Sequence, residues 1–191
     1  MDTHAITLRL AHPDDAEDLQ SYFNALSKAS RRDRFLGGVA DQPLAEIHRT
    51  IGSLDSSLFC LIANRPTGST RQIIGEAVCA VAASAEVALS VADTVQDCGL
   101  GRALLATVES LAMQRGAREL HGTTFDTNDR MKVLARSCGY AIERSGDDWT
   151  HRVFRKALPV CETLPFPSGP AMPASALPYL KGALREAVGC P

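Results

Sequence analysis

The chain has 191 residues, a net charge of −2 at pH 7, 45% hydrophobic residues and 22% charged residues. These values fit one soluble globular domain, alone or with an appendage, and exclude a disordered or collagen-like polymer. The longest uninterrupted apolar run, Ala77–Ala83, is far shorter than the roughly 20 residues of a membrane-spanning helix, so we expect no transmembrane segment and no membrane partner.

The amino terminus, MDTHAITLRL, lacks the cationic start and apolar stretch of a signal peptide, so a cytoplasmic location is expected. The six cysteines include no CxxC pair, which argues against a metal site and against a disulfide framework. The near-neutral charge balance also argues against a nucleic-acid partner, because a polyanion usually selects a basic surface.

Prolines divide the chain into two parts. Seven of the ten prolines follow Leu158, and proline neither continues a helix nor donates to a strand ladder. We therefore expect a folded domain over residues 1–158 and a Pro-rich tail over residues 159–191. Within the tail, helical spacing of Leu177, Leu180 and Leu184 predicts a short helix over residues 176–188, which would dock on its own domain or on the second subunit of a homodimer. The alternative is a flexible tail that binds a partner.

The first half of the chain predicts short elements of both kinds. A strand over residues 6–10 precedes a helix that begins at Pro13 with acidic residues in its first turn, and a second helix spans residues 44–51. Three strands follow at 57–63, 72–81 and 86–91, with a turn at 64–69 between the first two. Their short connections favour an antiparallel meander.

The second half contains the clearest helix, at residues 99–115, with Gly116 at its expected C-terminal cap. The remaining predicted elements are a strand at 118–125, a helix at 128–137, and strands at 140–143 and 149–154. Hairpins combined with a single crossover unit indicate the α+β class, with a mixed, mostly antiparallel sheet flanked by helices.

A glycine-containing turn joins the strand that ends at Val91 to this long helix. Gly99 and Gly101 permit close backbone approach, and the free N–H groups of the first helical turn favour an anion by roughly 0.3–1 kcal/mol per contact. Gln96 and Arg102 could add side-chain donors, so the turn predicts a pyrophosphate site. Glycines in such turns also occur for steric reasons alone, which remains the alternative.

Two common phosphate motifs do not match this turn. Leu104 stands where a dinucleotide-binding fingerprint requires its third glycine, and the Gly-Lys-Ser/Thr of a P-loop is missing.

Three motifs together resemble the GNAT superfamily of N-acetyltransferases over residues 5–158. They are Gln96-x-x-Gly99-x-Gly101, Asn128-x-x-Met131 and Gly139-Tyr140. The resemblance implies acetyl-CoA as cosubstrate, bound by Leu89, Ser90, Val91, Gln96, Asp97, Cys98, Gly99, Leu100, Gly101, Arg102 and Asn128. Asp97 and Cys98 replace a commoner glycine and basic residue, which removes a cation from the phosphate loop.

A narrower resemblance concerns the segment Leu26-Ser27-x-x-Ser30-x-x-x-Arg34-Phe35, which looks like bacterial protein-lysine acetyltransferases of the Pat type. Ala85-Glu86 matches the same group. This resemblance implies direct attack by a protein lysine on acetyl-CoA in a ternary complex. Segments rich in Ser and Arg are also frequent as plain helix caps and solvated faces, and Arg31, Arg32 and Arg34 have that alternative reading.

The chemistry requires a base, because an amine with a pKa near 10.4 loses its proton at pH 7 at a cost of about 4.6 kcal/mol. Strand periodicity places Glu86, Ala88 and Ser90 on one face, where small neighbours leave room for a ligand. The resemblance implies that Glu86 is this general base. The alternative is an exposed carboxylate at the start of a strand.

The departing thiolate has no obvious acid. The resemblance places a tyrosine seven residues after Asn128 in many family members, but this chain has Ala135 there, and Tyr140 corresponds to a packed ring. A thiol with a pKa near 8.5 can leave without a dedicated acid. The resemblance also implies that a backbone N–H near Val91 polarises the thioester. Cys98, at a helix N-terminus, is a redox candidate or simply a small turn residue.

Three functions therefore remain open from the sequence. The favoured one is N-acetyl transfer from acetyl-CoA to a protein lysine. A small-molecule amine is the alternative acceptor, and the altered Asp97-Cys98 loop together with Ala135 leaves open a catalytically degenerate acetyl-CoA-binding regulatory module.

Overall fold

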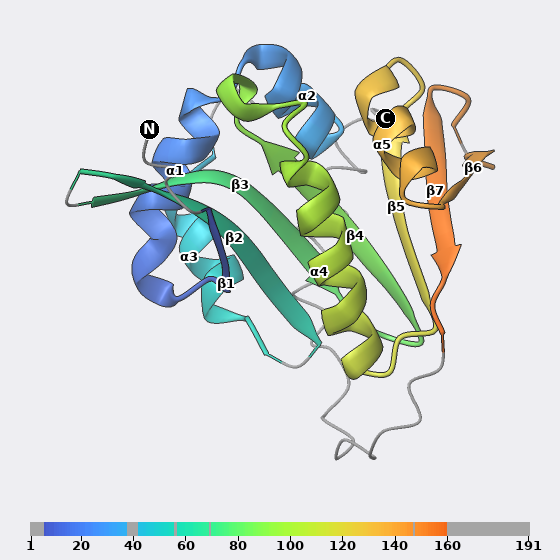
Figure 1. Ribbon diagram of the computed structural model, residues 1–191, viewed down its shortest axis with the longest axis horizontal. Helices are drawn as coiled ribbons and strands as arrows, with labels where there is room; N and C mark the ends of the chain where they lie inside the picture. Colours follow the sequence, from blue (N-terminus) through green and yellow to red (C-terminus); the bar gives the residue numbers. More distant parts are fainter. Residues whose placement is uncertain (1–5, 38–41, 56, 69, 147, 160–191) are drawn as a thin grey trace, which may run out of the picture.

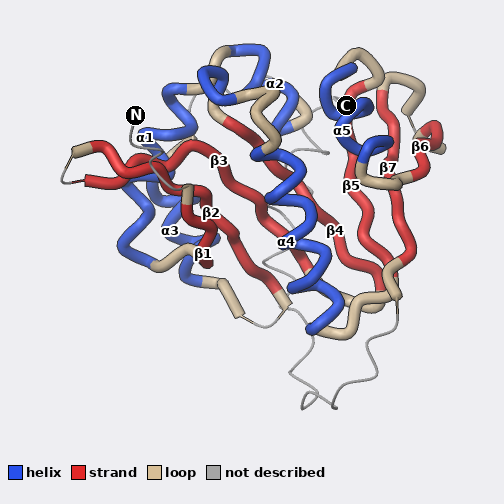
Figure 2. The backbone as a smooth tube through the Cα atoms, viewed as in Figure 1, coloured by secondary structure: helices blue, strands red, loops and turns tan. Residues whose placement is uncertain are grey.

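The computed structural model describes residues 6–37, 42–55, 57–68, 70–146 and 148–159, arranged as a sheet with helices on both faces (Figures 1 and 2). The N-terminal half contains β1 (Thr7–Leu10), the 3-10 helix η1 (Pro13–Asp15), α1 (Ala16–Ala25), α2 (Lys28–Phe35), α3 (Leu44–Gly52), β2 (Leu58–Thr67), β3 (Thr70–Ala80) and β4 (Ser84–Val91). The C-terminal half contains η2 (Asp93–Val95), α4 (Leu100–Gln114), β5 (Glu119–Phe125), α5 (Asp129–Ser137), β6 (Ala141–Arg144) and β7 (His151–Ala157).

The seven strands lie in the order β1-β2-β3-β4-β5-β7-β6. Only the β4–β5 pair is parallel, and the other five neighbouring pairs are antiparallel. The predicted α+β class, meander and single crossover are confirmed. The position of β7 between β5 and β6 was not predicted, because hairpin order along the chain does not specify which strand lies at the edge.

Each face of the sheet has its own apolar core. Leu104, Leu105 and Val108 of α4 are fully buried on one face, which α5 also covers. Helices α1 and α3 cover the opposite face of the meander through Phe23 and Ile47. Among the described residues, no helix is both long and apolar enough to cross a membrane. The predicted helix at 176–188 lies outside the described residues.

Helix α2 was missing from the sequence prediction. Its sequence, KASRRDRF, contains one large apolar residue and therefore shows no apolar stripe. An N-terminal cap and tertiary contacts stabilise this helix instead. The Ser27 hydroxyl accepts from the N–H of Ser30 at 3.2 Å, and both Arg34 and Phe35 are buried.

The predicted turn at residues 64–69 was too long. β2 continues through Pro66, which is opposite Arg71, and the turn itself is tighter, with Gly68 at φ +61°. A register shift between Ala63 and Asn64 interrupts the regular pairing. Proline is tolerated here because it lies at the end of the hairpin rather than in the middle of the ladder.

Strands β4 and β5 separate along their length (Figure 1). Their parallel pairing comprises Ser84–Glu119, Ala85–Leu120 and Glu86–His121, although β4 continues to Val91 and β5 to Phe125. Beyond Glu86, that edge of β4 has no β5 partner, so its backbone groups face the gap.

Gly122 lies where the gap begins. A Cβ at this position would lie 2.5 Å from the carbonyl oxygen of Val87 and 2.3 Å from Cζ of Phe154. Strands β5, β4 and β7 therefore approach one another here only because Gly122 has no side chain.

We expect Gly122→Ala to lower the free energy of unfolding by about 1–3 kcal/mol, because backbone and ring must both move to admit a methyl group. Chemical denaturation of this variant and of Gly146→Ala measures the effect. Gly146 has no heavy atom within 4 Å of an added Cβ, so it is the matched control. Equal stability of the two variants would contradict the steric account.

Candidate functional site

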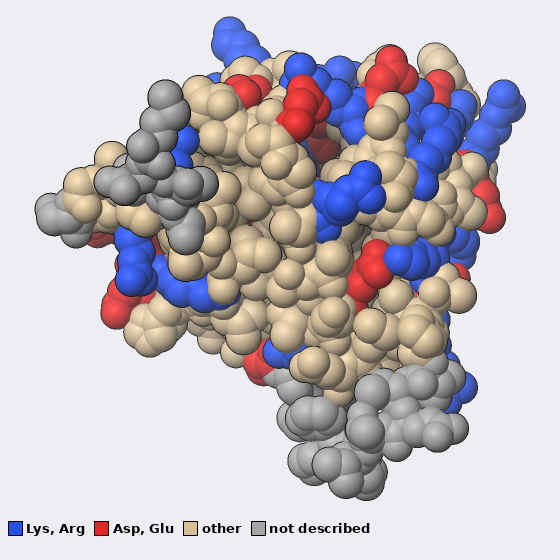
Figure 3. All heavy atoms as spheres, viewed as in Figure 1, with Lys and Arg blue, Asp and Glu red and all other residues tan. Residues whose placement is uncertain are grey.

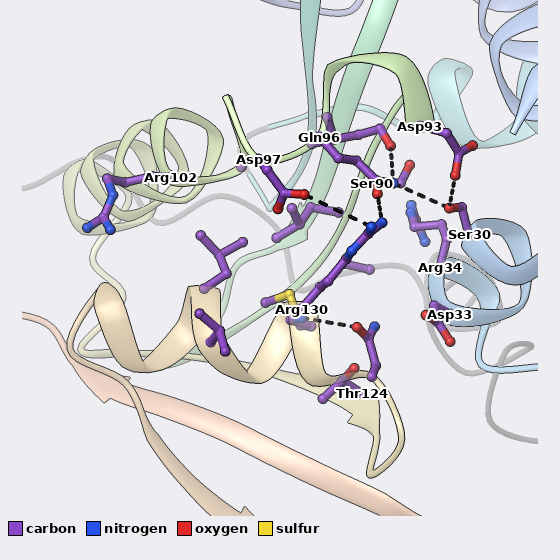
Figure 4. Close-up of a pocket in the computed structure, with 18 of the residues that line it drawn as sticks. Ser30, Asp33, Arg34, Ser90, Asp93, Gln96, Asp97, Arg102, Thr124 and Arg130 are labelled. Carbon is purple, nitrogen blue, oxygen red and sulfur yellow. Dashed lines mark hydrogen bonds and ion pairs between the residues drawn. The ribbon is translucent and has the colours of Figure 1, made fainter. Parts of the chain in front are cut away.

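The gap between β4 and β5 opens into a pocket of about 560 Å³, within the range of ligand-binding cavities. Val87–Val91 line one side, and Thr123 and Thr124 line the other. The loop before α4, the start of α5 and the pocket side of α2 complete the walls (Figure 4). The sequence predicted ligand contacts on β4 and the loop but none on β5 or Asp33.

The loop at one end of the pocket has the geometry of an anion cradle. Gly99 adopts φ +86° immediately before α4, and no side chain caps the helix. The N–H groups of its first turn therefore remain available to an anion. An added Cβ at Gly101 would lie 3.0 Å from Leu134 Cδ2, so this glycine also allows α4 and α5 to approach closely.

The two predicted side-chain donors of this loop behave differently. Gln96 donates through Nε2 to the Val91 carbonyl at 3.2 Å and to Ser30 Oγ at 3.4 Å, which ties the loop to β4 and α2. Arg102 donates to the carbonyl and hydroxyl of Ser137 at 2.9 and 3.0 Å. Its guanidinium is thus bound to the end of α5 rather than free for the cradle.

Cys98 and Asn128 have structural partners. The Cys98 thiol is exposed and donates to the Val95 carbonyl at 2.6 Å, which closes the turn before α4. Asn128 lines the pocket, and its Oδ1 accepts from the N–H of Met131 at 3.0 Å, so it caps α5.

Ser90 is the centre of a buried polar network that the sequence analysis missed. Its hydroxyl donates to Glu76 Oε1 at 2.6 Å and lies 2.9 Å from the Tyr22 hydroxyl. Arg34 donates to both oxygens of Glu76, from Nε at 2.6 Å and from Nη2 at 3.0 Å. Burial raises the pKa of Tyr22 above its ordinary value, and the Glu76 charge adds to this.

This network corrects the solvated-face reading of Arg34. Its side chain is 2% exposed, and that of Glu76 is 0% exposed. Two charges are buried together because each would be very unfavourable alone. The available sequence signal was Glu76 itself, a single carboxylate within the apolar stretch Ile73–Val81.

Glu86 lies at the closed end of the gap, where the pairing of β4 with β5 ends at His121. It is half-buried, and the structure gives its carboxylate no hydrogen bond or ion pair with another described residue. The residues directly after it, Val87 and Ala88, line the pocket, whereas Glu86 itself borders it. The predicted facing pattern is confirmed, because Ala88 packs against the α1 side and Val87 against the α4 side.

The two positions considered for an acid are both buried. Ala135 is fully buried, so the helix offers no room for a larger side chain there. Tyr140 packs edge-on against Phe154, with ring centroids 5.5 Å apart, and burial raises the pKa of Tyr140. Neither residue lines the pocket.

The α2 end of the pocket is acidic, which the sequence analysis did not predict. Asp93 accepts from Ser30 Oγ at 2.6 Å and from the N–H and hydroxyl of Ser27 at 2.9 Å each. Burial alone would raise the pKa of Asp93, but these hydrogen bonds outweigh it and lower the pKa. Asp33 lines the same end, and the structure gives it no hydrogen bond or ion pair with another described residue. Burial raises the pKa of Asp33, partly offset by the Arg32 charge.

Charged side chains of both signs gather at the upper end of the face shown in Figure 3, where the gap opens, while the surface over the middle of α4 is largely uncharged. The lining itself includes Asp33, Asp93 and Asp97 together with Arg34, Arg102 and Arg130. The pocket therefore has acidic and basic groups at particular places in its wall, rather than a uniformly basic surface.

Comparison with solved structures supports this description of the fold. The GNAT domain of S. lividans PAT superimposes with a TM-score of 0.71 and 26% identity, over 79% of this chain and 89% of that one. The PaiA N-acetyltransferase of Thermoplasma acidophilum, solved in complex with coenzyme A, gives a TM-score of 0.65 at 17% identity, over 80% and 99% of the two chains.

Sequence comparison agrees. Acetyltransferase PA5475 of Pseudomonas aeruginosa is 28% identical over 161 residues, which cover 82% of this chain and 86% of that protein. Residues 23–140 match the model of the acetyltransferase (GNAT) family, and these residues include β2–β5, the glycine loop and α5. The chain therefore belongs to the acetyltransferase (GNAT) family.

Proposed function

We propose that this acetyltransferase moves the acetyl group of acetyl-CoA directly to a primary amine, with a protein lysine as the acceptor. The observation that carries the proposal is a single pocket with an anion cradle at one end and, at the other, the Asp33 carboxylate, which has no hydrogen bond or ion pair with another described residue. The cradle is then complementary to an anionic cosubstrate, and the acidic end is complementary to a cationic acceptor.

The residues present fit acetyl-CoA. The loop Gln96–Arg102 offers backbone N–H groups to its phosphates, and the unpaired edge of β4 beyond Glu86 offers backbone partners to an extended amide-containing arm. Thr124, on the opposite wall, has a buried hydroxyl without a hydrogen-bond partner among the described residues. When bound, acetyl-CoA supplies the acetyl thioester.

Glu86 is the proposed base. It lies on β4 at the closed end of the gap, directly before the residues of that strand that line the pocket. It would accept the proton of the incoming ammonium through water, because five residues of β4, about 16 Å at the usual strand rise, separate it from Val91. A backbone N–H of β4 near Val91 would donate to the acetyl oxygen. The thiolate leaves without a dedicated acid, since Ala135 and Tyr140 supply none.

The lysine acceptor is supported by the Leu26–Phe35 segment, which resembles Pat-type enzymes. This segment forms α2 and its cap, which line the acidic end of the pocket.

An acceptor panel tests the function. We expect acetyl transfer to lysine-containing peptides, detected as N-ε-acetyllysine by mass spectrometry, to exceed transfer to polyamines and amino-acid amines. Transfer to small amines alone would contradict the protein-lysine acceptor. Binding of acetyl-CoA without turnover on any amine would contradict the enzyme and favour a regulatory module.

Replacement of the proposed base tests the mechanism. We expect Glu86→Gln to lower kcat by about 100-fold or more at pH 7, because the ammonium then loses its assisted route to the free amine. The deficit should shrink as pH approaches the amine pKa of about 10.4, where the free amine is abundant. Steady-state transfer over a pH series measures both effects.

Glu143→Gln is the matched control, because Glu143 is an exposed strand carboxylate outside the pocket lining. A Glu86→Gln enzyme with unchanged rates and unchanged pH dependence would contradict a base at this position.

The role of Asp33 is tested by Asp33→Asn. We expect KM for the amine to rise about 10-fold, with the Kd for acetyl-CoA unchanged, because a charge-assisted contact to the ammonium is lost. Since burial raises the pKa of Asp33, lowering the pH should weaken wild-type amine binding at a higher pH than an ordinary aspartate would.

Asp18→Asn, at an exposed position of α1 outside the pocket, is the control. A change in acetyl-CoA affinity, or no change in the KM for the amine, would argue against Asp33 as the acceptor contact.

A further inference from the structure

Three arginines line the pocket, but two of them already have strong partners. Arg34 is buried against Glu76, and Arg102 is bound to Ser137 at both of its terminal nitrogens. The loop that resembles a phosphate site carries an aspartate and a cysteine where the resembled family commonly has a glycine and a basic residue. Of the described lining residues, Arg130 is therefore the cation best able to exchange partners.

Arg130 extends from the first turn of α5 across the pocket mouth to the loop before α4 (Figure 4). One terminal nitrogen donates to Gln96 Oε1, and the other lies 4.0 Å from Asp97 Oδ2. The side chains of Arg130 and Asp97 are 70% and 79% exposed. Water screens such an ion pair, so its contribution is small and a better anion can replace it.

We propose that Arg130 is the side-chain cation that binds the diphosphate of acetyl-CoA, and that Asp97 competes with the diphosphate for it. A cation from α5 thus replaces the one missing from the loop. The inference rests on acetyl-CoA as cosubstrate and is independent of the acceptor. A phosphate group offers a guanidinium two charge-assisted hydrogen bonds at once, which the 4.0 Å contact to Asp97 does not provide.

The position of Asp97 supports the competition. It adopts φ +61°, a conformation uncommon for residues other than glycine. This backbone places a carboxylate beside the helix N-terminus that would otherwise favour an anion without opposition. Asp97 therefore repels a phosphate directly and also holds the guanidinium that would bind it.

Isothermal titration calorimetry of the full chain with acetyl-CoA at low ionic strength measures the Kd and tests the proposal without measuring acetyl transfer. We expect Arg130→Gln to weaken binding about 10-fold or more, and Asp97→Asn to tighten it about 3-fold. Asparagine tolerates a positive φ, so the backbone of the loop should be retained. The gain from Asp97→Asn should be smaller in the Arg130→Gln background, because no guanidinium remains to be released.

Arg136→Gln is the matched control, because it removes the same charge from the same helix. Arg136 is exposed and does not line the pocket. It should bind acetyl-CoA as the wild type does. Thermal unfolding of each variant checks that the fold is intact.

Truncated ligands locate the contact. Dephospho-CoA retains the diphosphate and should show the same fold loss with Arg130→Gln, whereas S-acetylpantetheine lacks it and should bind both proteins equally.

Four results would overturn the proposal. Arg130→Gln could bind acetyl-CoA with wild-type affinity, or Arg136→Gln could lose as much affinity as Arg130→Gln does. Arg130→Gln could also lose as much affinity for S-acetylpantetheine as for acetyl-CoA, or lose none for dephospho-CoA. If wild type binds acetyl-CoA but no amine is acetylated, the proposed function fails while this inference stands.

Discussion

The site depends on one constraint, the limited pairing of β4 with β5. Their parallel ladder ends at Glu86–His121, and the unpaired lengths of both strands then form the walls of a pocket. Unpaired backbone groups inside a protein require other partners. A ligand with amide and carbonyl groups meets that requirement, so the same break in pairing creates both the space and the binding groups. Gly122 makes the approach of the strands possible at the start of the gap.

A second interaction fixes α2 at the end of the pocket that contains Asp33 and Asp93. The buried Arg34–Glu76 pair joins α2 to β3, and Ser90 on β4 shares a carboxylate oxygen with it. Breaking a buried pair leaves an uncompensated charge, which is far more costly than losing an exposed one. Helix α2, which has no apolar stripe, is thereby fixed against the sheet and presents Ser30 and Asp33 to the pocket.

The arrangement of charges within the pocket matters more for binding than the net charge of the molecule. The overall charge is −2, yet the pocket has an end bounded by helix N–H groups and Arg130 and another bounded by Asp33 and Asp93. In a partly enclosed cavity, such local placement acts more strongly than the net charge, which salt screens over about 8–10 Å. A near-neutral protein can therefore bind a polyanion and a cation side by side.

The sequence by itself determined the class of the fold, the meander, the long helix α4 and the glycine loop, because apolar periodicity and glycine positions act over a few residues. It also singled out Gln96 and Asn128, which line the pocket, and Glu86, which borders it, although their roles stay predictions. The tertiary structure alone decided which charges meet. Glu76, Arg34 and Ser90 come from three separate elements, Arg130 of α5 reaches Asp97 in the loop before α4, and α2 exists without an apolar stripe. Ion pairs between distant segments leave no periodic signal, because only folding brings their partners within a few ångströms.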